Sequence, residues 1–263
     1  MIPANRLAHV AVLAACVAVL DGCGDFSSSP SGEIPGYSVI CVLSNVVAPT
    51  RVTVYPVVPA DSSSTLVEGA RVLISWPEGS ATLTKSEVPN RLWGTTFSAY
   101  ADTGRRVEVI PGRRFFLQAL CPDGTEIGGH TTVPGDFRIL APRPGDTLLV
   151  VGGYVDLLVS WTPSYGGAGY VVEIACDAEG ETSGRGRWGP RSYVVFDTTW
   201  VGRVSVAERY YGMFAVNVTA FDRHYFEHVF AGVPSAGVDN AFGVMAACWT
   251  RTATVFLVGA QAR

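Results

Sequence analysis

One proline-rich stretch divides the chain into two parts, and this division leads us to expect two domains. The stretch reads Pro134-Gly-Asp-Phe-Arg-Ile-Leu-Ala-Pro-Arg-Pro-Gly145. Pro134, Pro142 and Pro144 fix their own φ angles and push the residues before them into extended conformations. No helix should therefore cross residues 134–145, which we call the strap and expect to run as a stiff, extended segment. Sequence of β type lies on both sides of it.

The composition favours an all-β protein. The chain has 263 residues, enough for two domains with separate cores. It is rich in β-branched and aromatic residues, glycine and proline, and only 16% of its residues are charged. Long apolar repeats at the helical period are absent after the N-terminal segment. We expect two β-sandwich domains in tandem, over residues 37–136 and 137–263.

Charge and motifs exclude several classes of function. The net charge of −4 argues against a nucleic-acid-binding protein, which needs a basic face. Lys85 is the one lysine among 19 basic residues, and we attribute this bias towards arginine to coding rather than to anion binding. Nucleotide-binding, hydrolase and zinc-protease motifs are absent, so we expect neither an enzyme nor a cofactor.

The N-terminus carries an export signal. Arg6 precedes the apolar run Leu7–Leu20, which suits a signal peptide better than a membrane span. The run closes at a segment ending in Cys23 that resembles a bacterial lipobox, although Asp21 departs from the pattern. Cys16 fits the pattern locally, but cleavage there would expose apolar residues. The resemblance implies a protein with a lipid on Cys23, with Cys16 as the alternative.

The segment after Cys23 is polar and should not fold. Residues 1–22 would be removed as the signal peptide, and residues 23–36, rich in Ser, Gly and Pro, would form a flexible tether. The residue after Cys23 is Gly24. By resemblance to lipoproteins of Gram-negative bacteria, it implies delivery to the outer membrane, facing either the periplasm or the surface.

The first half shows short strands separated by turns, a pattern typical of a sandwich. The expected strands are Tyr37–Val47, Arg51–Val58, Leu66–Trp76, Arg105–Ile110, Arg114–Cys121 and Glu126–Val133. The segments Gly69–Ile74, Val109–Leu117, Asp123-Gly124 and Thr132–Pro134 resemble the transthyretin-like domain of a family of surface lipoproteins often encoded beside TonB-dependent receptors. The resemblance covers residues 37–137 and implies a fold and an outer-membrane transporter as a possible partner.

The second half resembles a fibronectin type III domain. Its expected strands are Asp156–Trp161, Gly169–Ile174 and Phe214–Asp222. The residues that match the family pattern are Trp161, Tyr170, Val216, Val218 and Ala220. Phe214 departs from it, because the usual tyrosine hydroxyl is missing there. The resemblance covers residues 139–222 and implies a sandwich whose loops gather at two poles.

Four cysteines remain outside the N-terminal segment. Export would place them in an oxidising compartment, and four cysteines allow three connectivities. If they pair at all, the simplest arrangement joins Cys41 to Cys121 and Cys176 to Cys248, one bond in each half. We favour the first bond, because Cys176 and Cys248 could fall at opposite ends of the second sandwich.

Two patterns could mark a metal site, but both have simpler interpretations. His224 and His228 would share one face of a helix, yet we expect an aromatic loop there, because the segment follows a strand. Residues 177–181 look superficially like a calcium loop, but the twelfth position is Trp188 rather than a bidentate Glu. We expect no metal.

Exposed aromatic residues are the best candidates for contacts with a partner. The loop 162–168, the turn near 197–200 and the long segment 223–240 should share one pole of the second sandwich. The candidates there are Tyr165, Tyr225, Phe226 and Phe230, although these rings could instead cap the sandwich. A second loop, with Arg187 and Trp188, could bind an anionic glycan or phosphate, or simply be solvated.

These observations leave two functional hypotheses. The first is a non-catalytic binding or accessory lipoprotein of the cell envelope that presents loops to a protein or a glycan. The second is a structural subunit or spacer of an envelope assembly, in which both domains form a rigid stalk.

Overall fold

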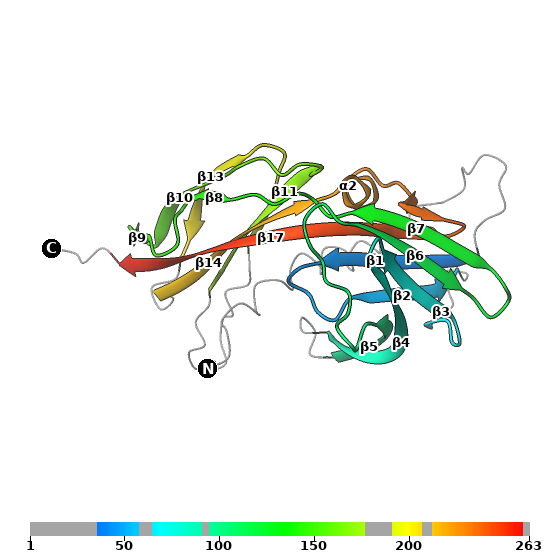
Figure 1. The fold of residues 1–263 in the computed structure, drawn as a ribbon. Helices are drawn as coiled ribbons and strands as arrows, with labels where there is room; N and C mark the ends of the chain where they lie inside the picture. The colour runs from blue at the N-terminus through cyan, green and yellow to red at the C-terminus, as the bar shows by residue number, and fades with distance from the viewer. Residues whose placement is uncertain (1–35, 58–64, 91–94, 177–190, 207–211, 260–263) are drawn as a thin grey trace.

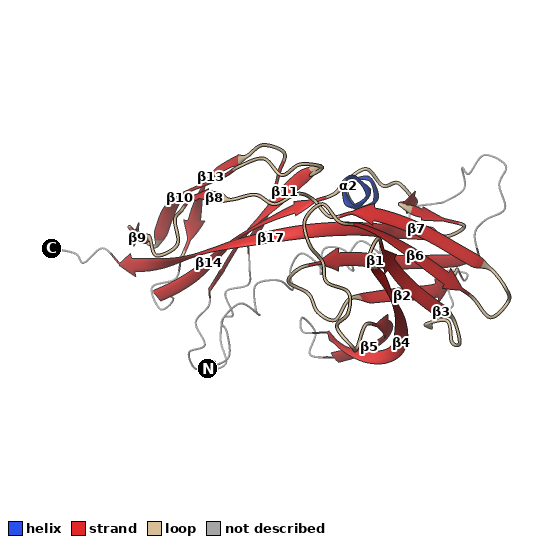
Figure 2. Ribbon diagram, in the orientation of Figure 1, coloured by secondary structure: helices blue, strands red, loops and turns tan. Residues whose placement is uncertain are grey.

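The computed structural model describes residues 36–57, 65–90, 95–176, 191–206 and 212–259. The protein is all-β, with two β-sandwiches in tandem, as the sequence predicts (Figure 1). One short helix, α2 (Arg223–Val229), lies in the described part of the chain (Figure 2). The expected signal peptide, Cys23, Cys16 and most of the tether fall outside the described residues. Within those residues, no helix combines the length and apolar composition needed to cross a membrane.

Seven strands and two short edge pieces build the first sandwich around the start of the last strand. They are β1 (Tyr37–Ser44), β2 (Arg51–Pro56), β3 (Arg71–Trp76), β4 (Gly79–Asn90), β5 (Thr95–Ala101), β6 (Arg114–Leu120), β7 (Glu126–Thr132), β15 (Ser235–Ala236) and β16 (Val238–Asp239). β4 changes sheets along its length, since residues 79–83 pair with β3 and residues 84–90 pair with β5. This corner folds one continuous ladder into two facing layers.

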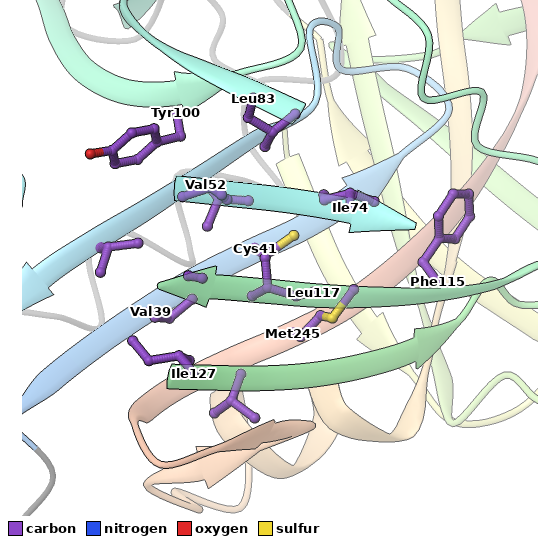
Figure 3. Close-up of a cluster of buried hydrophobic side chains, with 14 of the residues drawn as sticks. Val39, Cys41, Val52, Ile74, Leu83, Tyr100, Phe115, Leu117, Ile127 and Met245 are labelled. Carbon is purple, nitrogen blue, oxygen red and sulfur yellow. The ribbon is translucent and has the colours of Figure 1, made fainter. Parts of the chain in front are cut away.

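Alternating side chains fill the first core. In β6, Phe115, Leu117 and Ala119 point inwards while their neighbours are exposed, which is the period of two expected for a half-buried strand. Figure 3 shows side chains from β1, β2, β3, β6 and β7 meeting in this core, together with Met245 from the last strand. Burying such aliphatic and aromatic groups is the main stabilising contribution to this half.

The second sandwich has the strand order of a fibronectin type III domain. Its strands are β8 (Ile139–Ala141), β9 (Thr147–Val150), β10 (Tyr154–Trp161), β11 (Gly169–Cys176), β12 (Arg191–Val195), β13 (Thr199–Ser205), β14 (Gly212–Phe221) and β17 (Phe242–Gly259). One sheet runs β13-β10-β8 and the facing sheet runs β12-β11-β14-β17. Trp161, Tyr170, Val216, Val218 and Ala220 all lie in the core between them, as the resemblance implies.

β17 belongs to both sandwiches. Its first half pairs in parallel with β1, and its second half pairs in antiparallel with β14. In Figure 1 it runs as one long red strand past both halves of the molecule. Its odd-numbered side chains line both cores: Met245 and Ala247 face the first, and Val255 and Leu257 face the second.

The expected division at residue 136/137 therefore does not separate two self-contained cores. Val238, Ala241, Met245 and Ala247 come from the C-terminal part of the chain but fill the core of the first sandwich. The reason is physical: without β17, the edge of β1 would be unpaired and one side of that core would be open to water.

Side-chain contacts reinforce the junction between the sandwiches. Asp136 in the strap accepts hydrogen bonds from Nε and Nη2 of Arg251, at 2.8 and 2.5 Å, and from the indole of Trp249 at 2.9 Å. The Asn45 amide donates to the carbonyl of Thr250 at 3.0 Å and accepts from its N–H at 2.9 Å. The strap is thus held against the middle of β17, and the loop after β1 is held beside it.

One expectation about the first half is wrong, and one hairpin was not predicted. Residues 105–110 form no strand, because Asp102 binds the backbone N–H of Val107 at 2.6 Å and Arg105 has a positive φ of 52°. The hairpin of β4 and β5 was not expected from the sequence. Polar residues such as Thr84 and Glu87, on exposed positions of β4, weaken its apolar alternation.

The expected disulfides are also wrong. Cys41 and Cys121 are free, buried thiols, and burial raises the pKa of Cys41 to about 12. Cys121 interacts with the side chain of Tyr37, at the start of β1. Cys41 lies four residues further along β1, which is roughly 13 Å from Tyr37 at the usual strand rise. The two cysteines therefore lie at different parts of β1.

The strand register excludes the other bond. Cys176 lies opposite Phe214 and Cys248 lies opposite Phe221, so the two cysteines are seven residues apart along β14. That is roughly 24 Å along the strand, far beyond the reach of a disulfide, whose Cα atoms must come within about 7 Å.

Candidate functional site

The segment after β14 forms a helix where the sequence analysis expected a loop. Asp222 is the N-cap of α2, and its Oδ1 accepts a hydrogen bond from the backbone N–H of Tyr225 at 2.9 Å. The helix ends at Phe230, whose N–H donates to the carbonyl of Phe226. Tyr225, Phe226 and Val229 share one face at helical spacing and pack towards β17. An aspartate before such a pattern is a helix start signal that could have been recognised.

α2 and its C-cap residue carry three rings of a cluster that also includes one ring from β14 and one that directly follows β12. We call Phe196, Phe221, Tyr225, Phe226 and Phe230 the aromatic cluster. The ring centroids of Phe221 lie 5.2 Å from Tyr225 and 5.5 Å from Phe230. Phe196 meets Phe226 edge-on at 5.7 Å and lies 6.5 Å from Phe230. These separations are in the range in which aromatic pairs attract one another.

Gly169 makes this packing possible. A Cβ atom at residue 169 would lie 2.5 Å from the ring of Phe221 and 2.9 Å from that of Phe196. Both rings therefore lie against the bare backbone at the start of β11, and any other residue would push them apart.

The cluster has a buried side and an exposed side. Tyr225 is 1% exposed, so it cannot contact a partner, and its expected role in binding is corrected to one in the core. Phe226 is half-buried. Phe230 is 41% exposed and Phe196 is 63% exposed, which leaves two adjoining rings open to solvent. Exposed aromatic residues that lie together are typical of contact sites.

Tyr165 lies in the loop that leads from β10 into β11. It is 92% exposed, and its backbone carbonyl accepts a hydrogen bond from the N–H of Gly135 in the strap at 2.8 Å. The same loop is tied to the end of β14, since the N–H of Ala168 donates to the carbonyl of Phe221 at 2.8 Å, and Ala168 packs against the apolar cluster that contains Tyr225 of α2. We call Tyr165, Phe196 and Phe230 the exposed rings. As expected, the loop 162–168 and the segment after β14 meet at one pole.

Asp222 joins the base of α2 to the first sandwich. Its Oδ2 accepts a hydrogen bond from the hydroxyl of Thr131 on β7, and the imidazole Nδ1 of His224 lies 4.0 Å away. Burial raises the pKa of Asp222 to about 6, although its hydrogen bonds oppose that shift. Each carboxylate oxygen thus has a donor, so α2 is anchored to both β7 and its own first turn.

The histidines of this region have structural partners. His224 Nδ1 bonds the carbonyl of Met245 at 3.1 Å, and His228 Nδ1 bonds that of Val233 at 3.0 Å. His130 on β7 meets His224 edge-on with ring centroids 5.3 Å apart, and desolvation lowers the pKa of His130. No group of three or more His, Cys, Asp or Glu residues in the described ranges could hold a metal. Arg187, Trp188 and residues 177–181 lie outside those ranges.

Phe196 is the ring that sequence reasoning missed. It directly follows β12, opposite Gly169 across the ladder, and precedes the turn at Asp197. A phenylalanine between a strand and an Asp-Thr-Thr turn is a weak signal, because strand ends carry aromatic residues for many reasons. Only its proximity to α2 shows that it belongs with Phe226 and Phe230.

No protein family and no curated protein matches this chain. The solved structure of the IG1 and IG2 domains of DIP-gamma is 14% identical with a TM-score of 0.25, over 87% of this chain and 99% of that chain. A structure described as a Ca²⁺-stabilized adhesin that helps an Antarctic bacterium reach out and bind ice is 12% identical with a TM-score of 0.25, over 87% of this chain and 50% of that chain. Similarities at this level carry no argument about function, and the strands themselves define the fold.

Proposed function

We propose that this chain is an exported, lipid-anchored, non-catalytic binding protein of the bacterial cell envelope, which presents the exposed rings to a protein partner. Cys23 would carry the lipid, and residues 23–36 would tether the sandwiches to the outer membrane. The apolar run before Cys23 and the polar segment after it support this location. The lipoprotein resemblance favours an outer-membrane transporter or another envelope protein as the partner.

The observation that carries the proposal is the arrangement of the exposed rings on a rigid base. Phe196 and Phe230 adjoin Phe226, while Tyr225 and Phe221 beneath them are fully buried. Aromatic side chains held in place lose little entropy on binding and are enriched among the residues that dominate interfaces. Tyr165 extends the same pole with a ring that is almost wholly in solvent.

Site-specific photo-crosslinking in cells tests this proposal. A photoreactive amino acid is placed at Tyr165 or Phe230, and in a separate strain at Val201, which is 73% exposed on β13 of the opposite sheet. We expect one discrete protein adduct from Tyr165 and from Phe230 and none from Val201. Equal labelling from all three positions would contradict the proposal, and an adduct to carbohydrate alone would indicate a glycan ligand instead.

A double variant separates contact from folding. Phe196→Ala with Phe230→Ala should remove the adduct formed from Tyr165 and lower the melting temperature only slightly, because Phe196 is 63% exposed and Phe230 is 41% exposed. A large fall in melting temperature would show that the exposed rings serve mainly as a cap on the sandwich.

The anchor is tested by mass spectrometry of the mature N-terminus. We expect a diacylated and N-acylated Cys23, and a detergent requirement that is lost in Cys23→Ser. Acylation at Cys16, or an unmodified terminus elsewhere, would remove this part of the proposal while leaving the site at the exposed rings untouched.

A rigid spacer is the second candidate function. The observation that favours it is the sharing of β17 by both sandwiches, with Asp136 fixed to Arg251 at the junction. Both roles can coexist, since a spacer holds its binding pole at a set distance from the membrane.

A further inference from the structure

β1 and β17 lie side by side and run in the same direction. Seven residue pairs join them in register, from Ser38 with Phe242 to Ser44 with Cys248. In Figure 1 both arrows point to the left, and β17 continues well beyond the tip of β1. The chain therefore enters β1 at one end of the molecule and leaves β17 at Gly259 near the other end. At the usual strand rise, residues 242–259 span roughly 55 Å.

This geometry decides how the pair responds to tension. If the start of β1 and the end of β17 are pulled apart, the two parallel strands are drawn past each other along their axes. The ladder bonds then carry the load together, and all of them must fail at once. If instead the two strands are pulled from the same end, the bonds open one after another. The same ladder is thus strong in the first direction and weak in the second.

The path of the load avoids the connection between the sandwiches. β17 is one continuous backbone from the first core to Gly259, so tension reaches β1 without passing through the strap. The second sandwich stands beside this path, paired to β17 through β14. The two sandwiches consequently do not carry the tension one after the other. The rupture force of the protein is therefore not set by the weaker of the two sandwiches.

Local details strengthen the ladder at both of its ends. Gly243 lies so close to Val39 that a Cβ atom there would be 1.9 Å from the carbonyl oxygen of Val39. Beyond Ser44, the side-chain amide of Asn45 takes the place of a strand and makes two hydrogen bonds with the backbone of Thr250. The ladder is continuous from the first contact to the last.

We propose that this chain bears tensile load between its N-terminal and C-terminal ends, and that the β1–β17 pair is the clamp that resists it. This function goes beyond partner binding and does not depend on the exposed rings. It suits a protein that is held at its N-terminal end and loaded towards its C-terminal end.

Single-molecule force spectroscopy on the full chain tests the clamp directly. Handles are attached through click-reactive amino acids, at positions 36 and 259 for the first geometry and at positions 36 and 240 for the second. We expect the first geometry to need at least about twice the rupture force of the second, since forced unfolding follows the barrier along the pulled direction. Equal forces in the two geometries would overturn the proposal, and this comparison needs no mutation.

Two matched leucine variants locate the clamp. Leu43 on β1 and Leu157 on β10 are both fully buried, one in each core. We expect Leu43→Ala to lower the rupture force between positions 36 and 259, and Leu157→Ala to lower the melting temperature while leaving that force unchanged. A loss of force in Leu157→Ala as large as that in Leu43→Ala would show that the load passes through the second sandwich, contrary to the proposal.

Discussion

The two halves of β17 show how one strand can serve two different environments. Residues 242–248 are buried on both faces, because Met245 and Ala247 face the first core while Val244 and Ala246 lie under α2. Residues 249–259 are buried mainly on the odd-numbered face. Their even-numbered face carries Thr250, Thr252 and Thr254, followed by the partly exposed Phe256 and Val258. The difference shows that a strand covered by a helix needs apolar residues on both faces, whereas the uncovered part of the same strand needs them mainly on one. The backbone pairing of β17 continues through both parts.

The largest expected effect contrasts two large apolar residues on this one strand. Met245→Ala should lower the free energy of unfolding by about 2–5 kcal/mol, because the side chain is fully buried and its loss leaves a cavity. Phe256→Ala is the control: that ring is 44% exposed, so we expect a loss of less than about 1 kcal/mol. Chemical denaturation measures both. Similar losses would show that the two halves of β17 are packed alike.

The second effect concerns the polar face of the C-terminal half. Thr252 donates to Asn217 at 2.7 Å, and Glu173 lies directly opposite Asn217 on β11. Burial raises the pKa of Glu173 to about 8. Its proton is therefore held more tightly in the folded state than in the unfolded state, and this contribution to stability falls as the pH rises from the unfolded pKa to the folded pKa.

We expect the free energy of unfolding to fall by on the order of 2 kcal/mol between pH 5 and pH 8, as measured by denaturation at each pH. Asp222 contributes in the same direction below pH 6, since its raised pKa is about 6. Glu173→Gln should remove most of the slope above pH 6 and leave, below pH 6, only the smaller slope that Asp222 contributes. A wild-type stability that rises through this range would contradict the assignment.

A smaller effect comes from exchanging residue types between the two halves. Val244→Thr should cost about 1–2 kcal/mol, because it places a hydroxyl in the dry space under α2. The reciprocal change Thr254→Val, on the same face beyond the helix, should change stability by less than about 0.5 kcal/mol. Thermal melts of the two single variants and of the double variant measure both effects. Equal costs would mean that α2 does not make this face different.

The smallest effect lies at the boundary between the halves. Arg251→Ala should lower the free energy of unfolding by about 1 kcal/mol, because Nε and Nη2 of Arg251 each donate a hydrogen bond to the carboxylate of Asp136. Arg251 lowers the pKa of Asp136, so the contribution is present at neutral pH and disappears as the pH falls through that lowered pKa. Arg203→Ala, which removes the exposed pair with Asp156, is the matched control and should cause no measurable change.

The sequence predicted many of the strands and missed the features that depend on distant contacts. Apolar alternation indicated a strand over Leu66–Trp76, whose second half is β3. Asp156–Trp161 and Gly169–Ile174 were expected from the resemblance to a fibronectin type III domain, and both lie within observed strands. Residues 242–248 do not alternate, because α2 covers their second face, and their pairing with β1 could not be foreseen. Parallel pairing between such distant segments leaves no local signal.

The candidate site was only partly predictable for the same reason. The meeting of the loop 162–168 with the segment after β14 follows from strand order alone, and that expectation is confirmed. Which rings face solvent depends on α2: the helix turns Tyr225 into the core and leaves Phe230 outside. Phe196 joins them only because Gly169 leaves room beside the backbone. Sequence order could not provide either fact.

The position of β17 at the end of the chain also governs how the protein can be assembled. β1 is synthesised well before its partner in the ladder, which follows 204 residues later, from Ser38 to Phe242. Such a distant contact closes slowly, because the entropy of the intervening chain must be lost before the pairing forms. The N-terminal sandwich therefore lacks one wall of its core until synthesis has passed residue 248. A chain still emerging from the ribosome therefore cannot close its first core until β17 has been made.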